Sequence, residues 1–159
     1  MSKILVAGVG NIFLGDDGFG VDVAAHLRSQ AIPAEVGVED FGIRGVHLAY
    51  KLLEGYDLLI IVDALPLGAA PGTVCVFEPE LDSDPVELVS DAHSLNPHTV
   101  LAMAKTLGAR IGRVVVVGCE PINLTEGIGL SDPVAHAVHD AARVVRELIN
   151  QELASRVEA

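Results

Sequence analysis

Apolar and polar positions along the chain predict strands and helices in turn. Residues 3–9 (KILVAGV) form a short apolar run that ends at a glycine, which is typical of a buried parallel strand. Phe19, Val23 and Leu27 instead recur at helical spacing and predict a helix over residues 19–30. Further apolar runs predict strands at residues 34–39, 58–62, 73–77 and 113–117.

Three more helices are predicted between these strands and after the last of them. The helix expected at residues 45–54 carries an apolar stripe of Val46, Ala49, Tyr50 and Leu53. Asn96-Pro97 and Asp132-Pro133 each place a capping side chain before a proline in the first turn, which is a helix-start signal. These two helices are expected to end near Leu107 and Leu153, and residues 154–159 are expected to fray.

Alternation of strands with helices predicts the fold class. Consecutive β and α elements imply right-handed crossovers, so we expect a three-layer α/β fold with a mainly parallel, five-stranded twisted sheet flanked by helices. The 159 residues suffice for one domain, which we take to span residues 1–159. Half of the residues are hydrophobic and 20% are charged, a balance that is globular rather than disordered.

The charge balance narrows the possible partners. Ten Lys and Arg residues against 22 Asp and Glu residues give a formal net charge of −12, so we expect neither nucleic acid nor an anionic membrane as a partner. The N-terminal apolar run is too short for a signal peptide, and no segment approaches the roughly 20 apolar residues of a membrane helix. We therefore expect a cytoplasmic protein.

Carboxylates follow three successive strands of the predicted sheet. Asp16 and Asp17 lie in the loop after the first strand, and Asp40 and Asp63 directly follow the second and third. Ligand sites in open α/β sheets form beyond the carboxyl ends of the strands, so this edge is the candidate site. An unpaired carboxylate beside the apolar strand 58–62 would be costly, which favours a function for Asp63. One of Asp16 and Asp17 is expected to be a solvated loop residue or a helix cap.

Histidines supply the remaining candidate ligands. His93 lies just before a predicted helix and His98 lies in its first turn, so either could reach the strand edge. Four others lie within predicted helices and are expected to be surface residues or to pack between helices: His26, His47, His136 and His139. Two carboxylates and one imidazole suit a divalent first-row metal such as Ni²⁺ or Zn²⁺ and leave coordination positions open.

Several familiar motifs are absent. The Gly8-x-Gly10 loop lacks the third glycine of a dinucleotide site, because position 13 is Phe13. The sequence also contains no HExxH metalloprotease motif and no GxSxG nucleophile motif.

The chain resembles the [NiFe]-hydrogenase maturation proteases, endopeptidases that trim the hydrogenase large subunit. The matching segments keep their order over nearly the whole chain: residues 8–20 (GVGNIFLGDDGFG), 40–43 (DFGI), 59–64 (LIIVDA), 93–95 (HSL) with Leu101, and 118–121 (GCEP). The resemblance implies that the chain cleaves a C-terminal extension from a [NiFe]-hydrogenase large-subunit precursor after nickel insertion.

The same resemblance implies the site residues. The family's metal-binding trio maps onto Asp17, Asp63 and His93, and His93 is preferred to His98 because only His93 keeps the spacing to Leu101. Asp40 matches a family carboxylate with a role in cleavage or substrate recognition. The expected catalytic set is therefore Asp17, Asp40, Asp63 and His93. Nickel is expected to arrive with the precursor, although other divalent metals could occupy the site.

The chain departs from the family pattern at two positions, and three other functions are also considered. Phe41 stands where relatives often have glycine, which we expect to affect the choice of hydrogenase, and Cys119 replaces a residue that is usually aliphatic. One rival is a cysteine hydrolase with Cys119 as nucleophile and His93 as base, although a buried, apolar Cys119 is expected. The other rivals are a non-enzymatic nickel sensor or metallochaperone, and a hydrolase with a different substrate.

Overall fold

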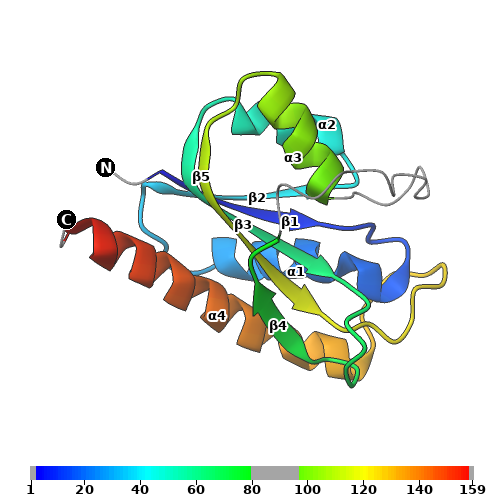
Figure 1. Ribbon diagram of the computed structural model, residues 1–159. Helices are drawn as coiled ribbons and strands as arrows, with labels where there is room; N and C mark the ends of the chain where they lie inside the picture. Colours follow the sequence, from blue (N-terminus) through cyan, green and yellow to red (C-terminus); the bar gives the residue numbers. More distant parts are fainter. Residues whose placement is uncertain (1–2, 80–96, 158–159) are drawn as a thin grey trace.

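A computed structural model of the protein describes residues 3–79 and 97–157. Its five-stranded sheet has the order β2-β1-β3-β5-β4 (Figure 1). The strands are β1 (Ile4–Val9), β2 (Val36–Gly42), β3 (Tyr56–Ala64), β4 (Val74–Phe77) and β5 (Ile111–Cys119). All pairings are parallel except that of β4 with β5, so the predicted mainly parallel sheet is confirmed.

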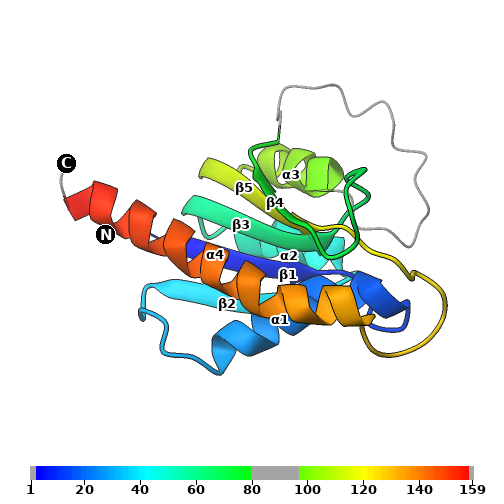
Figure 2. The same cartoon turned by 90° about the horizontal axis from the view of Figure 1, so that it is seen from below.

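Helices cover both faces of this sheet and give the expected three layers (Figures 1 and 2). They are α1 (Phe19–Arg28), α2 (Gly45–Leu52), α3 (Pro97–Thr106) and α4 (Asp132–Val157), with a short 3₁₀ helix η1 (Gly15–Gly18) before α1. Helices α1 and α4 pack on one face, and α2 and α3 pack on the other.

Side-chain alternation along the strands separates two apolar cores. Ile4 and Val6 of β1 face α1 and α4, whereas Leu5 and Ala7 face α2 and α3. Strand β3 is buried on both faces, as its continuous apolar sequence predicts. The predicted stripe of α1 is confirmed, because Phe19, Val23 and Leu27 are all fully buried.

The structure corrects three details of the predicted elements. Strand β3 continues through Asp63 to Ala64 rather than stopping before Asp63. Helix α4 continues to Val157, so the fraying expected from residue 154 is wrong for residues 154–157.

The third correction concerns which face of α2 is buried. Leu48, Ala49 and Leu52 are fully buried, whereas Val46, Tyr50 and Leu53 of the predicted stripe are exposed. Helix α2 has apolar residues on two faces, and only contact with the sheet decides which of them is inside. None of the described helices combines the length and apolar character needed to cross a membrane.

Candidate active site

Asp63 lies near the carboxyl end of β3, the central strand of the sheet. Its register partner is Gly118 of β5, and only 6% of its surface is exposed. Burial, reinforced by the nearby charge of Asp17, raises the pKa of Asp63 well above its usual value. Among the described residues no Lys or Arg forms an ion pair with Asp63. A buried carboxylate facing a second carboxylate is costly, as the sequence led us to expect.

The glycine loop after β1 places Asp17 beside this carboxylate. Gly10 has a φ of 133°, and a Cβ there would come within 1.9 Å of the Asp17 carbonyl oxygen. The backbone N–H of Asn11 donates to Asp17 Oδ2 at 2.7 Å. Only glycine allows this close approach, so the loop geometry fixes the Asp17 carboxylate.

Helix α1 starts directly on the sheet edge. A Cβ at Gly20 would lie 2.1 Å from the Val62 carbonyl oxygen and 2.4 Å from that of Val9. The first turn of α1 therefore touches the ends of both β1 and β3, which brings the loop carrying Asp17 to Asp63.

Asp16 is a structural residue and not a solvated loop residue or a helix cap. It is fully buried and accepts hydrogen bonds from the backbone N–H groups of Ile122, Asn123 and Ser131 and from Ser131 Oγ, at 2.7–2.9 Å. Burial alone would raise the pKa of Asp16, but these hydrogen bonds outweigh it and lower the pKa. Asp16 thus ties the loop after β5 to the loop after β1.

The side chains of Asp40 and Asp63 lie on opposite faces of the sheet. It aligns with Gly8 in β1, which aligns in turn with Val62 of β3. Since Val62 faces α1 and α4, Asp40 lies on that face, while Asp63 points to the opposite one. The Asp40 carboxylate pairs with Arg28 of α1 at 3.2 Å.

Cys119 ends β5 at the same edge, and Glu120 follows it. Cys119 is fully buried, and burial, together with the charges of Asp16 and Glu120, raises its pKa to about 11. A buried thiol with a raised pKa is a poor nucleophile, which argues against a cysteine hydrolase. The expected buried cysteine is confirmed. Glu120 Oε1 accepts the backbone N–H groups of Leu67 and Ala69, at 2.7 and 3.0 Å, and so holds the loop after β3.

The histidine predictions have different outcomes. His93 lies outside the described residues, as does the side chain of His98, although α3 starts at Pro97 as predicted. The other four lie in helices as expected, and the rings of His26 and His139 meet between α1 and α4 with centroids 4.5 Å apart. Within residues 3–79 and 97–157 no three potential ligands come together to hold a metal ion.

Two adjoining grooves lie beside the carboxylates. The first, of about 300 Å³, has mostly apolar walls that include Ile12, Phe13, Val21 and Ile43, and it borders Asn11, the hydrogen-bond donor to Asp17. The second, of about 440 Å³, is more polar and extends over α2 past His47, Tyr50 and Lys51. Asp40 and Arg44 line both grooves. Neither groove contains Asp17 or Asp63, so the grooves are candidates for binding a substrate rather than for chemistry.

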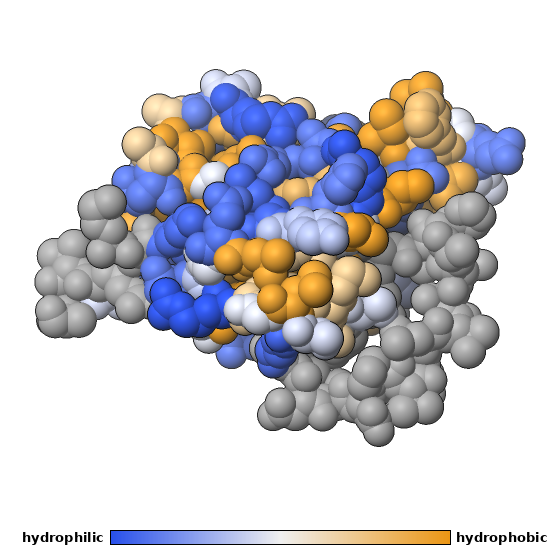
Figure 3. All heavy atoms as spheres, turned by 90° about the horizontal axis from the view of Figure 1, so that it is seen from above, coloured by the Kyte–Doolittle hydropathy of each residue, from blue (hydrophilic) through white to orange (hydrophobic). Residues whose placement is uncertain are grey.

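Apolar side chains are exposed at this end of the molecule (Figure 3). Backbone hydrogen bonds between Gly15 and Gly127 and between Gly127 and Phe13, at 2.9 and 2.8 Å, join the loops after β1 and β5. These joined loops expose Ile12, Phe13, Ile122, Leu124 and Ile128. Exposed apolar surface of this kind is typical of a protein-binding site.

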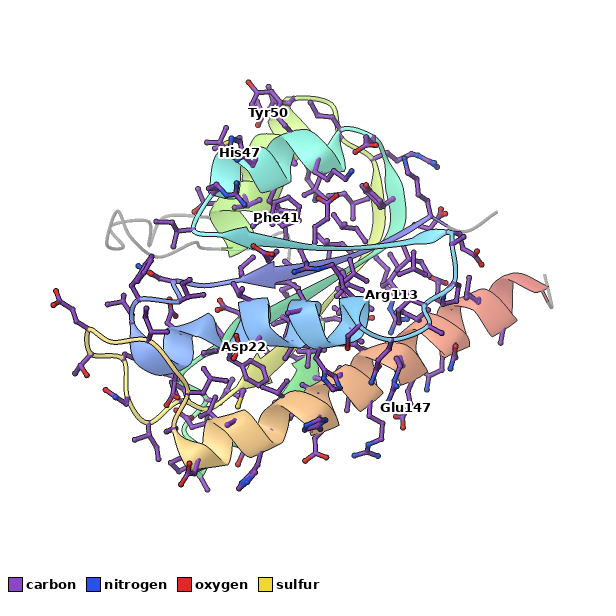
Figure 4. All side chains as sticks on the ribbon, turned by 180° about the vertical axis from the view of Figure 1, so that it is seen from behind. Asp22, Phe41, His47, Tyr50, Arg113 and Glu147 are labelled. Atoms are coloured by element: carbon purple, nitrogen blue, oxygen red, sulfur yellow. The ribbon has the colours of Figure 1, made fainter. Side chains whose placement is uncertain are left out.

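The roles of three residues near the site were not predicted from the sequence. Asp16 and Glu120 hold loops through backbone contacts more than 50 residues away in the chain, which no local pattern reveals. Arg44 follows the Asp40 segment, and its position on the apolar groove is visible only in the structure. Phe41, expected to affect substrate choice, is 5% exposed and packs beneath α2 (Figure 4), and it is also among the residues that line the second groove.

Comparisons with known proteins find a matching family and similar proteins. Residues 21–148 match the model of the hydrogenase maturation protease family HycI. The hydrogenase expression/formation protein HupD of Rhodobacter capsulatus is 33% identical over 154 residues, which cover 92% of this chain and 71% of that protein.

Solved structures agree with the family match. The hydrogenase maturating endopeptidase HybD from E. coli is 29% identical with a TM-score of 0.80, over 94% of this chain and 93% of that one. The hydrogenase 2 maturation peptidase from Thaumarchaeota archaeon SCGC_AB-539-E09 is 34% identical with a TM-score of 0.73, over 93% and 98%.

Proposed function

The chain belongs to the hydrogenase maturation protease family and is a peptidase, and from this premise we propose its substrate and its means of recognition. The substrate is a [NiFe]-hydrogenase large-subunit precursor, from which the enzyme removes a C-terminal extension after nickel insertion. Asp17, Asp63 and His93 recognise the nickel that the precursor carries.

The observation that supports this proposal is the pair formed by Asp63 and Asp17. Asp63 is buried at the carboxyl edge of the sheet, has no cationic partner among the described residues, and lies close enough to Asp17 for repulsion to raise its pKa. A divalent cation between the two carboxylates would remove both penalties. Carboxylate oxygens with one imidazole are a fitting donor set for Ni²⁺ and leave positions for the precursor's own ligands.

Recognition of nickel by these residues makes cleavage conditional. The precursor holds nickel through its own cysteines, and Asp17, Asp63 and His93 add or exchange ligands, so that only a nickel-loaded precursor places its scissile bond at the strand edge. Docked there, the metal can polarise the scissile carbonyl or activate the attacking water.

Asp40 belongs to substrate recognition in this proposal. It lies on the other face of the sheet from Asp63, its carboxylate is paired with Arg28, and it lines both grooves. Asp63, near Asp17 at the strand edge, is therefore better placed than Asp40 to meet the nickel.

The test is to mix the purified protease with the host's large-subunit precursor, nickel-loaded or nickel-free, and to measure both products by intact mass. We expect a single C-terminal loss, only in the nickel-loaded sample. Asp17→Asn, Asp63→Asn and His93→Ala should each abolish processing, because each removes a ligand, while circular dichroism shows a retained fold. His98→Ala is the matched control and should have a mild effect.

Each other outcome has a defined meaning. Normal processing by any two of the three variants would contradict the metal trio. Nickel binding with no cleavage of a competent precursor would instead favour the nickel-sensing alternative. Turnover of an unrelated substrate alone would favour a different hydrolase.

A further inference from the structure

Arg44 lies where the two grooves beside the site meet. Of the residues that line the apolar groove and the polar groove, only Asp40 and Arg44 line both. The apolar groove leads from Asn11, next to Asp17, and the polar groove continues over α2, from which His47 and Tyr50 project (Figure 4). A peptide segment that runs from the carboxylates along both grooves therefore passes Arg44.

The charge of Arg44 is not neutralised by a carboxylate within the described part of the chain. Its Nε donates to the Phe41 carbonyl oxygen at 3.2 Å, and its Nη2 reaches the Asp40 carbonyl oxygen at 3.5 Å. The acidic residues that line the grooves have other cations: Asp40 pairs with Arg28, and Glu39 pairs with Lys51. Arg44 thus presents free guanidinium donors to whatever occupies the grooves.

This cation is conspicuous in a chain with a net charge of −12. Such a chain repels acidic segments in general, so an isolated guanidinium at the junction favours a single carboxylate at one position of a bound peptide. The walls beside it, Ile12, Phe13 and Ile43, are 40–60% exposed and favour apolar neighbours of that carboxylate.

We propose that Arg44 is a specificity-determining residue that binds an acidic side chain, flanked by apolar residues, in the C-terminal extension of the precursor. This inference rests on the proposed function, because it identifies the segment that the same site cleaves. A side chain is favoured over the terminal carboxylate because Arg44 lies between two open grooves and not at the closed end of one, so the bound chain continues past it.

The test uses the processing assay with nickel-loaded precursor and compares Arg44→Glu, Arg44→Lys and Arg110→Glu. Arg110 is exposed, and its side chain contributes to neither groove, so Arg110→Glu is a control with the same change of charge. We expect kcat/KM to fall at least about tenfold for Arg44→Glu, less for Arg44→Lys, and little for the control. Melting temperatures of all three variants separate loss of recognition from loss of fold.

The precursor side of the contact is tested by replacing each Asp or Glu of the extension by its amide. One of these replacements should lower kcat/KM of the wild-type protease as much as Arg44→Glu does, and it should cause no further decrease with Arg44→Glu. A lysine at the same position of the extension should restore cleavage by Arg44→Glu. Normal processing by Arg44→Glu would overturn the inference. So would a kcat/KM of Arg44→Glu that stays below that of the wild-type protease when every side-chain carboxylate of the extension has been neutralised. Failure of the wild-type protease to cleave would instead count against the proposed function.

Discussion

Asp63 is a buried carboxyl group that has no cationic partner in the described protein, and this combination is expected to lower stability at neutral pH. The folded state raises the pKa of Asp63 through burial and through Asp17. Between the ordinary aspartate pKa and this raised value, the unfolded chain ionises while the folded protein resists ionisation. Folding stability is therefore lost as the pH rises through this window, and the loss is absent below it.

Asp63→Asn is therefore expected to stabilise the metal-free protein while it abolishes processing. The amide keeps the shape of the side chain but has no charge to bury. We expect the melting temperature at pH 7 to rise by about 3 °C or more, and the gain to shrink as the pH falls toward about 4. Thermal unfolding of both proteins from pH 4 to 8 measures this.

Asp140→Asn is the matched control, because Asp140 is an exposed aspartate of α4. It should change the melting temperature little at any pH. A destabilised Asp63→Asn, or a gain that does not depend on pH, would contradict the conclusion that the fold disfavours ionisation of Asp63.

At the scale of elements, the adjacent residues Asp16 and Asp17 perform separable tasks. The short 3₁₀ helix η1 directs one carboxylate into the loop after β5 and the other toward Asp63. Asp16 accepts four hydrogen bonds, whereas the carboxylate of Asp17 accepts one, from Asn11.

The same substitution at the two positions should therefore affect different properties: stability at Asp16 and processing at Asp17. Asp16→Asn points amide donors at backbone donors and should cost about 2–4 kcal/mol at pH 7. Asp17→Asn should leave stability nearly unchanged and abolish processing. Since the folded state lowers the pKa of Asp16, its contribution is present above the ordinary aspartate pKa and is lost as the pH falls through the lowered value.

Chemical unfolding of both variants at pH 7 and pH 3 measures this difference. The gap between wild type and Asp16→Asn should narrow at the lower pH. Equal stability losses for the two variants would show that Asp16 is not the residue that holds the loop after β5.

How far the sequence predicts these elements depends on whether the deciding contacts are local. The apolar runs of β1 and β3 and the stripe of α1 are local patterns, and they gave the correct strands, helix and site edge. The exposed stripe of α2 and the antiparallel pairing of β4 depend on what each element meets in the fold, which periodicity does not record.

The same distinction holds for the site. Parallel strands bring their carboxyl ends to one edge, so the edge itself was predictable, and the structure places Asp17 near Asp63 there. The choice of Asp17 rather than Asp16 came from the family resemblance. Asp40 was expected at the same edge, but the alternation of side chains along β2 puts it on the other face of the sheet from Asp63. The roles of Asp16 and Glu120 depend on contacts between distant loops and could not be predicted from their neighbours in sequence.

At the scale of the whole molecule, the proposal divides the metal site between two proteins. Asp17, Asp63 and His93 supply three ligands at most, and the precursor supplies the rest together with the nickel. A three-ligand site with open positions holds a metal most firmly when the second protein completes the coordination. The protease should therefore require no metal of its own before it meets the precursor.

Treating the protease with a chelator and then removing the chelator tests this division. We expect the treated protease to cleave nickel-loaded precursor at the same rate as untreated protease, by intact mass and initial rate. Nickel-free precursor should remain uncut even when Ni²⁺ is added to the protease beforehand, because the metal must occupy the precursor's site for the scissile bond to be placed. If chelation abolishes cleavage and preloading the protease with a divalent metal restores it, then the metal resides in the protease and does not arrive with the substrate.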